Sequence, residues 1–561
     1  MVTPIDSNPA SKSPLLQQPI TEKKDDTQLS IENNANTTPV ITPSQPTPIE
    51  IQLVNEIETS HAAKLTEFKN LASDLQSINE IKELLAWDQM TYMLEKAGDT
   101  RAKQSACLSK LSHEIYTSDK MGELINHFKK EPNIKKINDI EKALLREAGK
   151  EYDKRKKLPT GLVEELENVT SKANTAWVSA RKNNKFSDFA PYLEKVFSLK
   201  RKVADLIGYE KSPYDALLDE FESGMTAEKL DHLFGKLKDD LIPLIKQIKE
   251  SPIQIDNSFL FRLVSDEKQM EISRGILNYM GFEGRLDKTT HPFSASIGLN
   301  DARITTRSNK NLFSFIGTIL HEGGHALYEP LGIDPALANT LLFTGASIGV
   351  HESQSRLMET QVGLSKPFWK GLLPILKNWH LSEQLHDIEL EQFYKAINKV
   401  EPSFIRVGSD EVTYNLHIIL RFELEKALLE GKLAVKDVPE VWNQKMQEYF
   451  GITPKTDTEG CLQDMHWSGG AIGYFPTYTI GNLLAAQIYN SVKKDIPELD
   501  KEITKRELTL LREWLREKIH KYGKTLLPAE IIKNATGEDL KPDYFSSYLK
   551  KKYSEIYELK D

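Results

Sequence analysis

The segment His321–His325, which reads HEGGH, constrains this chain more than any other feature. In a helix, residues four positions apart lie on one face, so His321 and His325 can bind one metal ion. Glu322 lies beside them and can reach a water on that metal, as in metal-dependent hydrolases. With 13 histidines in 561 residues, the pattern arises by chance in roughly a few per cent of such chains. The surrounding sequence therefore has to show whether this pattern is a metal site or a chance match.

A buried helix is predicted around the motif. Apolar residues recur at helical spacing over residues 312–327, and Pro330 and Gly332 follow as natural terminators. Gly323 and Gly324 are poor helix residues, each costing about 1 kcal/mol relative to Ala. We therefore expect a substrate backbone or a neighbouring helix to pack close to this turn.

A third metal ligand is needed, and the chain offers few candidates. The long metzincin motif requires Gly and His where this chain has Tyr328 and Leu331, so that class is excluded. The other common ligand is a Glu on a following helix, which favours Glu352. Glu329 competes but shares the first helix and would have to bend back, and His351 is expected to be a neighbour of the metal. Taken alone, Glu352 could equally be a salt-bridged helix residue.

Composition and charge exclude several classes of function. Charged residues make up 28% of the chain and the net charge is -9, which argues against non-specific nucleic-acid binding. The chain has two cysteines, Cys107 and Cys461, which argues against a disulfide scaffold and favours a reducing compartment. No apolar run is long enough to span a membrane, and the first residues lack a secretory signal. We expect a cytoplasmic protein with no membrane partner.

The chain is predicted to consist of a tail and one helical region. Residues 1–52 are rich in Pro, Ser, Thr, Asn and Gln and are expected to be disordered. Residues 53–561 show helical periodicity, for example at 65–85, 139–156 and 228–249. The best strand candidate, Ala302–Arg307, comes shortly before the motif helix. The predicted fold is mostly α, with at most a small β-sheet near the site.

Two later segments carry groups that suit a hydrolytic site. His466, Tyr474 and Tyr478 lie in a Gly-rich stretch and can donate hydrogen bonds to an oxyanion; each could equally anchor a tight loop. Arg406 and Arg421 can each bind the C-terminal carboxylate of a peptide in bidentate fashion, or form structural ion pairs.

A third segment precedes the motif helix. His291 begins a Pro-rigidified turn, and Asp301 and Arg303 follow in the predicted strand region. These residues could border a cleft or belong to a simple connection.

Together these motifs resemble the carboxypeptidase Taq family of metallocarboxypeptidases. The resemblance covers about residues 55–560 and includes Ala86–Gln89 near its start. The motifs that carry it, in chain order, are HPF at 291–293, D-x-R-x-T at 301–305, HEGGH at 321–325, HESQ at 351–354, I-R-x-x-S-D at 405–410 and G-x-x-Q-D-x-H-W at 460–467.

The resemblance implies a large, saddle-shaped helical fold similar to neurolysin and angiotensin-converting enzyme, with a long groove. It implies a homodimer that removes single residues from the free C-termini of peptides with broad specificity, using Zn2+, or Co2+ as an alternative. For the metal site, the resemblance implies ligands at His321, His325 and Glu352 and a general base at Glu322. It implies that His466 and one tyrosine, Tyr478 or Tyr474, donate hydrogen bonds to the transition state. It also implies that Arg406, or as second choice Arg421, binds the terminal carboxylate, and that the stretches containing His291 and Arg303 limit how far substrate extends into the groove.

Two rival interpretations remain open at this point. A metal-dependent oligo-endopeptidase would share the metal site but would not need an arginine for a terminal carboxylate. A helical binding protein could keep a metal, or only the pattern, without catalysis.

Overall fold

The computed structural model describes the backbone of residues 48–560 and the side chains of residues 59–560. The chain divides into two units, Met1–Thr59 and Ser60–Asp561. In the first unit, the described residues belong to the helix that begins at Pro48. The disordered tail predicted for residues 1–52 lies, up to residue 47, outside the described residues and stays a prediction.

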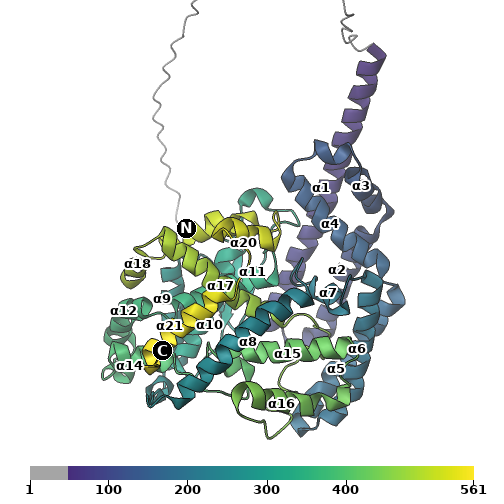
Figure 1. Ribbon diagram of the computed structural model, residues 1–561. Coiled ribbons are helices and arrows are strands. Elements are labelled where there is room, and N and C mark those ends of the chain that lie inside the picture. The colour runs from purple at the N-terminus through teal and green to yellow at the C-terminus, as the bar shows by residue number, and fades with distance from the viewer. Residues whose placement is uncertain (1–47, 561) are drawn as a thin grey trace, which may run out of the picture. The chain divides into compact units, whose positions relative to one another are not determined.

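The described part of the chain is mostly helical, as predicted, with one small sheet (Figure 1). Its α-helices are α1 (Pro48–Thr91), α2 (Gly98–Thr117), α3 (Asp119–Lys129), α4 (Asp139–Lys157), α5 (Thr160–Asn183), α6 (Phe186–Ile207), α7 (Pro213–Leu218), α8 (Ala227–Glu250), α9 (Asp266–Met280), α10 (Leu312–Tyr328), α11 (Ile348–Arg356), α12 (Lys366–Ile375), α13 (Ser382–Leu385), α14 (Leu390–Ile397), α15 (Tyr414–Leu429), α16 (Val438–Phe450), α17 (Pro476–Asp495), α18 (Leu499–Lys505), α19 (Thr509–Lys518), α20 (Pro528–Thr536) and α21 (Asp543–Tyr557). Every helix within residues 48–560 is too short or too polar to cross a lipid bilayer.

Local sequence explains where several of these helices begin. Asn138 caps α4 by accepting a hydrogen bond from the backbone N–H of Glu141, whose side chain accepts one in return. Thr226 caps α8 and Asn311 caps α10 in the same way, each accepting from the third residue of its helix. The helices predicted at 139–156 and 228–249 are confirmed, with bounds that differ by at most one residue.

The sheet has three short strands, β1 (Arg285–Lys288), β2 (Ser294–Ser296) and β3 (Ala302–Thr306). β3 lies in the middle and pairs in parallel with β1 and antiparallel with β2. Both β2 and β3 pack against α10. The predicted strand near the motif helix is therefore confirmed as the central strand of the sheet.

α17 is central to the packing of the second unit. It packs against α11, α15, α20 and α21, and α11 in turn packs against α10 (Figure 1). The helix that carries the HEGGH motif is thereby joined through α11 to α17. Of the 20 residues of α17, 15 are buried, and the apolar ones among them belong to the continuous core of the second unit.

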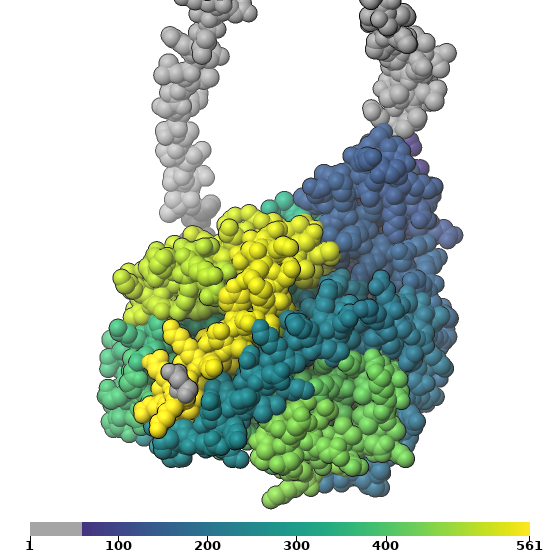
Figure 2. Space-filling model, in the orientation of Figure 1, coloured from purple at the N-terminus to yellow at the C-terminus, as the bar shows by residue number. Residues whose placement is uncertain are grey.

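Figure 2 shows α8 at the surface, flanked by segments that come later in the sequence. The teal segment that contains α8 runs between the yellow C-terminal segment, with α21, and the light green segment with α15 and α16. α8 buries one apolar face, which includes Leu230, Phe234, Leu237 and Leu241. This burial joins segments that are far apart in the sequence.

Candidate active site

α10 places the HEGGH motif in its last turns, as predicted. The helix ends at Tyr328, and the C-cap residue Glu329 precedes Pro330. The rings of His321 and His325 lie on the same face, with centroids 4.8 Å apart. Both are partly exposed, whereas Glu322 between them is buried.

The two glycines of the motif allow close packing. A Cβ at Gly324 would stand 2.5 Å from the carbonyl oxygen of Gln354, so any side chain there would collide with the backbone of α11. A Cβ at Gly323 would stand 2.5 Å from the Cε of Met280, the last residue of α9. The close neighbours expected at this turn are therefore two helices, α11 and α9. Gly324 tolerates a side chain less than Gly323 does, because it faces the backbone of α11 and not a flexible side chain.

α11 brings Glu352 to the two imidazoles. Ser347 caps this helix by accepting from the N–H of Val350. The Oε2 atom of Glu352 lies 3.7 Å from the Nε2 of His321 and 3.6 Å from the Nε2 of His325. One ligand atom from each of the three residues lies within 4.8 Å of the others.

These three residues fit a divalent metal such as zinc. Zinc–ligand bonds of 2.0–2.2 Å in a tetrahedral site place ligand atoms about 3.4 Å apart, close to the separations from Glu352. Two imidazoles and one carboxylate are a common donor set of catalytic zinc sites, which leave a position for water or substrate.

A carboxylate lies behind the first imidazole. The Nδ1 of His321 lies 2.9 Å from the Oε2 of Glu359. Glu359 belongs to the π-helical segment η5 (Leu357–Val362), which follows α11 directly. Arg356 donates to the same oxygen at 2.6 Å, and its Nε donates to Asn482 of α17. Burial opposes ionisation, but Arg356 and His321 lower the pKa of Glu359 to about 2.

An imidazole lies behind the second one. The Nδ1 of His325 lies 2.6 Å from the Nδ1 of His351, and the Nε2 of His351 lies 3.5 Å from Glu329. Glu329 also accepts from Thr344 and from the backbone N–H of Gly345. The alternative third ligand thus contacts His351, and the ligand group formed by the described residues contains Glu352 instead.

Glu322 lies among like charges in a buried position. Burial raises the pKa of its carboxyl group to about 7, and the charges of Glu352 and Glu359 act in the same direction, opposed by His321. A carboxyl group poised near neutral pH can accept a proton and later return it.

A buried ion-pair cluster joins the two candidate arginines. Arg406 donates to Oδ1 of Asp464 at 2.9 Å, and Arg421 donates to Oδ2 at 2.7 Å. Burial would raise the pKa of Asp464, but the two guanidinium groups hold it well below its usual range. Arg406 also donates to the hydroxyl of Tyr414 at 3.1 Å, whereas Arg421 has 0% exposure and donates to the carbonyl of His417.

The predicted oxyanion donors lie together. The Nε2 of His466 is 3.3 Å from the hydroxyl of Tyr478, and the rings of Tyr474 and Tyr478 meet edge to face. Burial lowers the pKa of His466 to about 4, so its imidazole is neutral at pH 7. Burial raises the pKa of both tyrosines, and the charge of Glu352 contributes to each shift. Both hydroxyls therefore stay protonated and can donate.

His291 and Arg303 lie at the sheet, and neither belongs to the group of three metal-ligand candidates. Arg303 on β3 forms a two-bond ion pair with Asp301 and stacks over Trp87 at 4.4 Å. His291 is exposed just before β2. Their side chains are therefore placed by the sheet, while the metal-ligand candidates are placed by α10 and α11.

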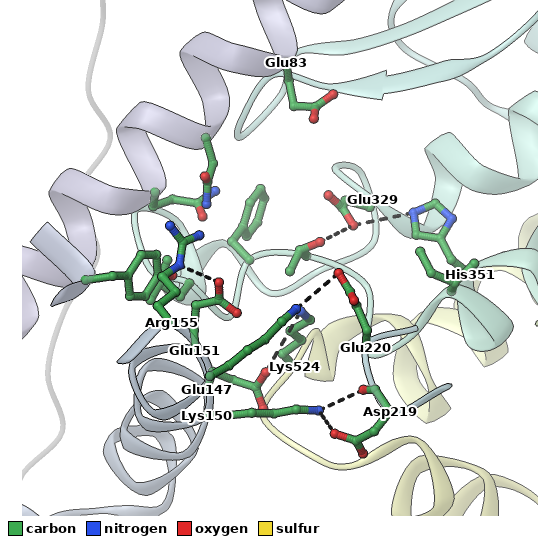
Figure 3. Close-up of a pocket in the computed structure, with 18 of the residues that line it drawn as sticks. Glu83, Glu147, Lys150, Glu151, Arg155, Asp219, Glu220, Glu329, His351 and Lys524 are labelled. Carbon is green, nitrogen blue, oxygen red and sulfur yellow. Dashed lines mark hydrogen bonds and ion pairs between the residues drawn. The ribbon is translucent and has the colours of Figure 1, made fainter. Parts of the chain in front are cut away.

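A cavity of about 960 Å³ adjoins the His325 side of the site (Figure 3). Glu329 and His351 line it, together with residues of α1, α4, β2 and the segment after α7. Its wall is strongly charged, with labelled acidic and basic side chains that include Glu83, Glu147, Lys150, Arg155, Asp219 and Lys524.

Four residues of this arrangement were not selected from the sequence: Arg356, Glu359, Tyr414 and Asp464. Asp464 lies inside the quoted motif G-x-x-Q-D-x-H-W, so its place in a motif was the available signal. Glu359 and Arg356 follow the HESQ motif without a pattern of their own.

Comparison with known proteins identifies the family of this chain. The model of the carboxypeptidase Taq (M32) metallopeptidase family matches residues 67–553. The chain is 43% identical over 498 residues to carboxypeptidase 1 of Bacillus subtilis, covering 88% of this chain and 98% of the relative. It is 38% identical over 485 residues to thermostable carboxypeptidase 1 of Pyrococcus furiosus, covering 85% and 96%. The crystal structure of an M32 carboxypeptidase from Deinococcus radiodurans aligns with a TM-score of 0.85 at 35% identity, covering 88% and 100%.

A match of this length, at this identity and with the same fold, cannot come from the short HEGGH pattern alone. The chain therefore belongs to the carboxypeptidase Taq (M32) family and is a metallocarboxypeptidase.

Proposed function

We propose that this metallocarboxypeptidase uses zinc to remove single residues, with broad specificity, from the free C-termini of peptides. The observation that carries the proposal is the convergence of His321, His325 and Glu352, whose ligand atoms lie within 4.8 Å of one another. Two imidazoles and a carboxylate suit zinc, and cobalt accepts the same nitrogen and oxygen donors. Bound there, the metal would polarise the scissile carbonyl and lower the pKa of a water molecule.

Glu322 is the proposed general base. It removes a proton from the attacking water and returns it to the leaving amine, which needs a group that ionises near the working pH. The buried position that raises its pKa to about 7 supports this role. Glu359, on the outer side of His321, holds that ligand ring in place.

His466 and Tyr478 are the proposed hydrogen-bond donors to the oxygen on which negative charge develops, with Tyr474 as the alternative tyrosine. Preorganised donors of this kind stabilise the transition state more than the ground state. The support is their contact at 3.3 Å and the protonated state of both hydroxyls.

Arg406 is the proposed binding group for the C-terminal carboxylate. Its Nε and Nη2 both donate to one oxygen of Asp464, and its Nη1 reaches Tyr414. Asp464 therefore occupies the edge formed by Nε and Nη2, and the remaining N–H groups of Nη1 and Nη2, beside Tyr414, are the ones proposed to bind the carboxylate. Arg421 is fully buried and donates hydrogen bonds to Asp464 and to the carbonyl of His417, so it is the weaker candidate for binding the carboxylate.

His291 and Arg303 are proposed to limit how far a peptide extends along the cavity. Ser294 and Ser296 of β2 line this cavity, and Arg303 on the neighbouring strand is fixed by Asp301. A homodimer and a cytoplasmic location stay predictions from the sequence and from the family resemblance.

The decisive experiment compares a peptide with a free C-terminus and the same peptide with a C-terminal amide, followed by mass spectrometry. The proposal predicts stepwise shortening of the free peptide and weak or no cleavage of the amide. It also predicts that Glu322→Gln still binds the metal but cleaves neither peptide. Internal cleavage of both peptides would indicate an endopeptidase. Metal binding without cleavage of either would indicate a binding protein.

A further inference from the structure

A chain of three polar side chains leads from the cavity to the proposed metal site. It begins at Glu329, passes through His351 and ends at His325, with separations of 3.5 Å between the carboxylate and Nε2 of His351 and 2.6 Å between the two Nδ1 atoms. Figure 3 shows the first of these contacts at the edge of the cavity. His351 and Glu329 both line this cavity.

The contact between the two imidazoles fixes where the protons lie. The Nε2 of His325 faces Glu352 and the position of the metal, so it must be free of a proton there. The Nδ1 of His325 then carries the proton and donates a hydrogen bond to His351, whose unprotonated Nδ1 accepts it. A neutral imidazole carries one proton, so the Nε2 of His351 is the protonated atom, and this N–H faces Glu329.

Glu329 is itself held in place. Its Oε2 accepts from Thr344 at 2.9 Å and from the backbone N–H of Gly345 at 2.5 Å. The loop is tied further because the N–H of Ala346 donates to the hydroxyl of Tyr328. The carboxylate therefore has a fixed position and favours the tautomer of His351 that donates towards it.

Gly345 makes room for this arrangement. A Cβ at position 345 would stand 2.7 Å from Cδ2 of His351 and 3.0 Å from Cε1 of Tyr328. The ring of His351 therefore packs against the loop that holds Glu329. The rings of His325 and His351 are tilted against each other with centroids 4.6 Å apart, so the two rings are in contact.

The two metal-ligand histidines are supported differently. His321 contacts the carboxylate of Glu359 directly, whereas His325 reaches a carboxylate only through a second imidazole. Because the partner of a ligand imidazole sets its tautomer and orientation, the two partners are not interchangeable.

We propose that His351 is a positioning residue for the metal site and that Glu329 sets its tautomer. The Nδ1 of His351 accepts a hydrogen bond from the Nδ1–H of His325, and this bond keeps the Nε2 lone pair of His325 directed at the position of the metal. Glu329 keeps the proton of His351 on Nε2, so that its Nδ1 stays an acceptor. The inference rests on the metal site of the proposed function and adds two residues to it.

The test uses the full-length protein with three substitutions. His351→Leu removes the acceptor at similar volume. His351→Asn keeps an acceptor, because its Oδ1 can occupy the place of Nδ1. Glu329→Gln removes the charge but keeps the shape. His127→Leu is the control variant, because it removes a histidine from α3, away from the proposed metal site.

Zinc affinity is measured by competition with a chelator, and zinc loss is timed after addition of EDTA. We expect His351→Leu to weaken zinc binding by about 10- to 100-fold, His351→Asn to bind close to the wild type, Glu329→Gln to fall between them, and His127→Leu to match the wild type. Circular dichroism of the metal-free proteins checks that each variant is folded.

The outcomes separate this inference from the proposed function. If the wild type binds zinc and folded His351→Leu binds it equally well, the inference is wrong while the proposed function stands. Equal weakening by His351→Leu and His351→Asn would also contradict it, because an acceptor at this position would then be irrelevant. If His351→Leu fails to fold, Glu329→Gln decides, and unchanged zinc loss in that variant would overturn the inference. A wild type that binds no divalent metal would refute the proposed function itself.

Discussion

Gly481 of α17 lies directly against the side chain of Glu352. A Cβ at position 481 would stand 2.5 Å from Cγ and 2.8 Å from Cβ of Glu352. The absence of a side chain on α17 therefore determines how close α11 can approach and where the proposed metal-binding carboxylate lies. Because Tyr478 lies in the first turn of α17, one helix positions both the proposed metal ligand and the proposed oxyanion donor.

The first prediction concerns this contact. Gly481→Ala should push Glu352 away from the two imidazoles and weaken zinc binding by about 10-fold or more, with a matching loss of kcat/KM. Gly235→Ala in α8 is the control, since a Cβ there meets nothing within 4 Å, and Ala stabilises a helix by about 1 kcal/mol relative to Gly. Zinc titration of both variants checks it. Equal zinc affinity in Gly481→Ala and the wild type would show that the contact does not position Glu352.

The second prediction separates the two arginines. Arg406→Met should lower kcat/KM for peptides with a free C-terminus by about 100-fold, mainly through KM, because a charge-assisted pair is lost. Arg421→Met should leave KM nearly unchanged and destabilise the fold by about 3–5 kcal/mol, more than Arg406→Met does, since Arg421 is the more deeply buried of the two partners of Asp464. Steady-state kinetics and urea unfolding of both variants measure the two effects. The opposite pattern, with KM raised mainly in Arg421→Met, would assign the carboxylate to Arg421.

The third prediction concerns the glycines of the motif. Gly324→Ala should reduce soluble yield and activity severely, because its Cβ would meet the backbone of α11, which cannot move aside cheaply. Gly323→Ala should be milder, since its neighbour is the flexible end of Met280. Thermal melts and peptidase assays of the two variants compare them. Equal damage by both substitutions would mean that packing against α11 is not the stricter constraint.

The fourth prediction concerns pH and Glu222, a buried acid that accepts from Ser347 and from the N–H of Gly349 at the start of α11. Burial raises its pKa from 4.5 to about 7, although both hydrogen bonds oppose the shift. The unfolded chain releases this proton near pH 4.5 and the folded protein keeps it until about pH 7. Its contribution to stability therefore falls as pH rises through this window, by about 3 kcal/mol in total, and is constant above it.

Glu222→Gln keeps the shape and cannot ionise, so its stability should fall less between pH 4.5 and 7 than that of the wild type. Urea unfolding of the metal-free proteins at pH 5 and pH 7.5 measures the difference. Parallel pH dependence in the two proteins would show that Glu222 is ionised in the folded state over the whole range.

The helices and the small sheet could be predicted because they depend on local patterns. The apolar periodicity before the HEGGH motif, the two terminators after it and the β-prone run at 302–307 each determine a structure within a few residues. The same holds for the close packing inferred from Gly323 and Gly324. Glu352 could be preferred over Glu329 as the third metal ligand because a carboxylate on a second helix can face the two histidines of the first helix.

The partners of these residues could not be predicted, since they depend on contacts between distant segments. Asp464 joins Arg406 and Arg421 from another part of the chain, and nothing in the local sequence indicates that one carboxylate bridges both. Glu359 reaches His321 from the π-helical turn of η5, where the ordinary helical spacing no longer tells which side chains share a face.

The most direct test of the metal site is a crystal structure of the zinc-loaded protein with anomalous data at the zinc edge. We predict one strong anomalous peak about 2.0–2.2 Å from the Nε2 atoms of His321 and His325 and from a carboxylate oxygen of Glu352. A peak bound by Glu329 or His351, or no peak between α10 and α11, would contradict the account.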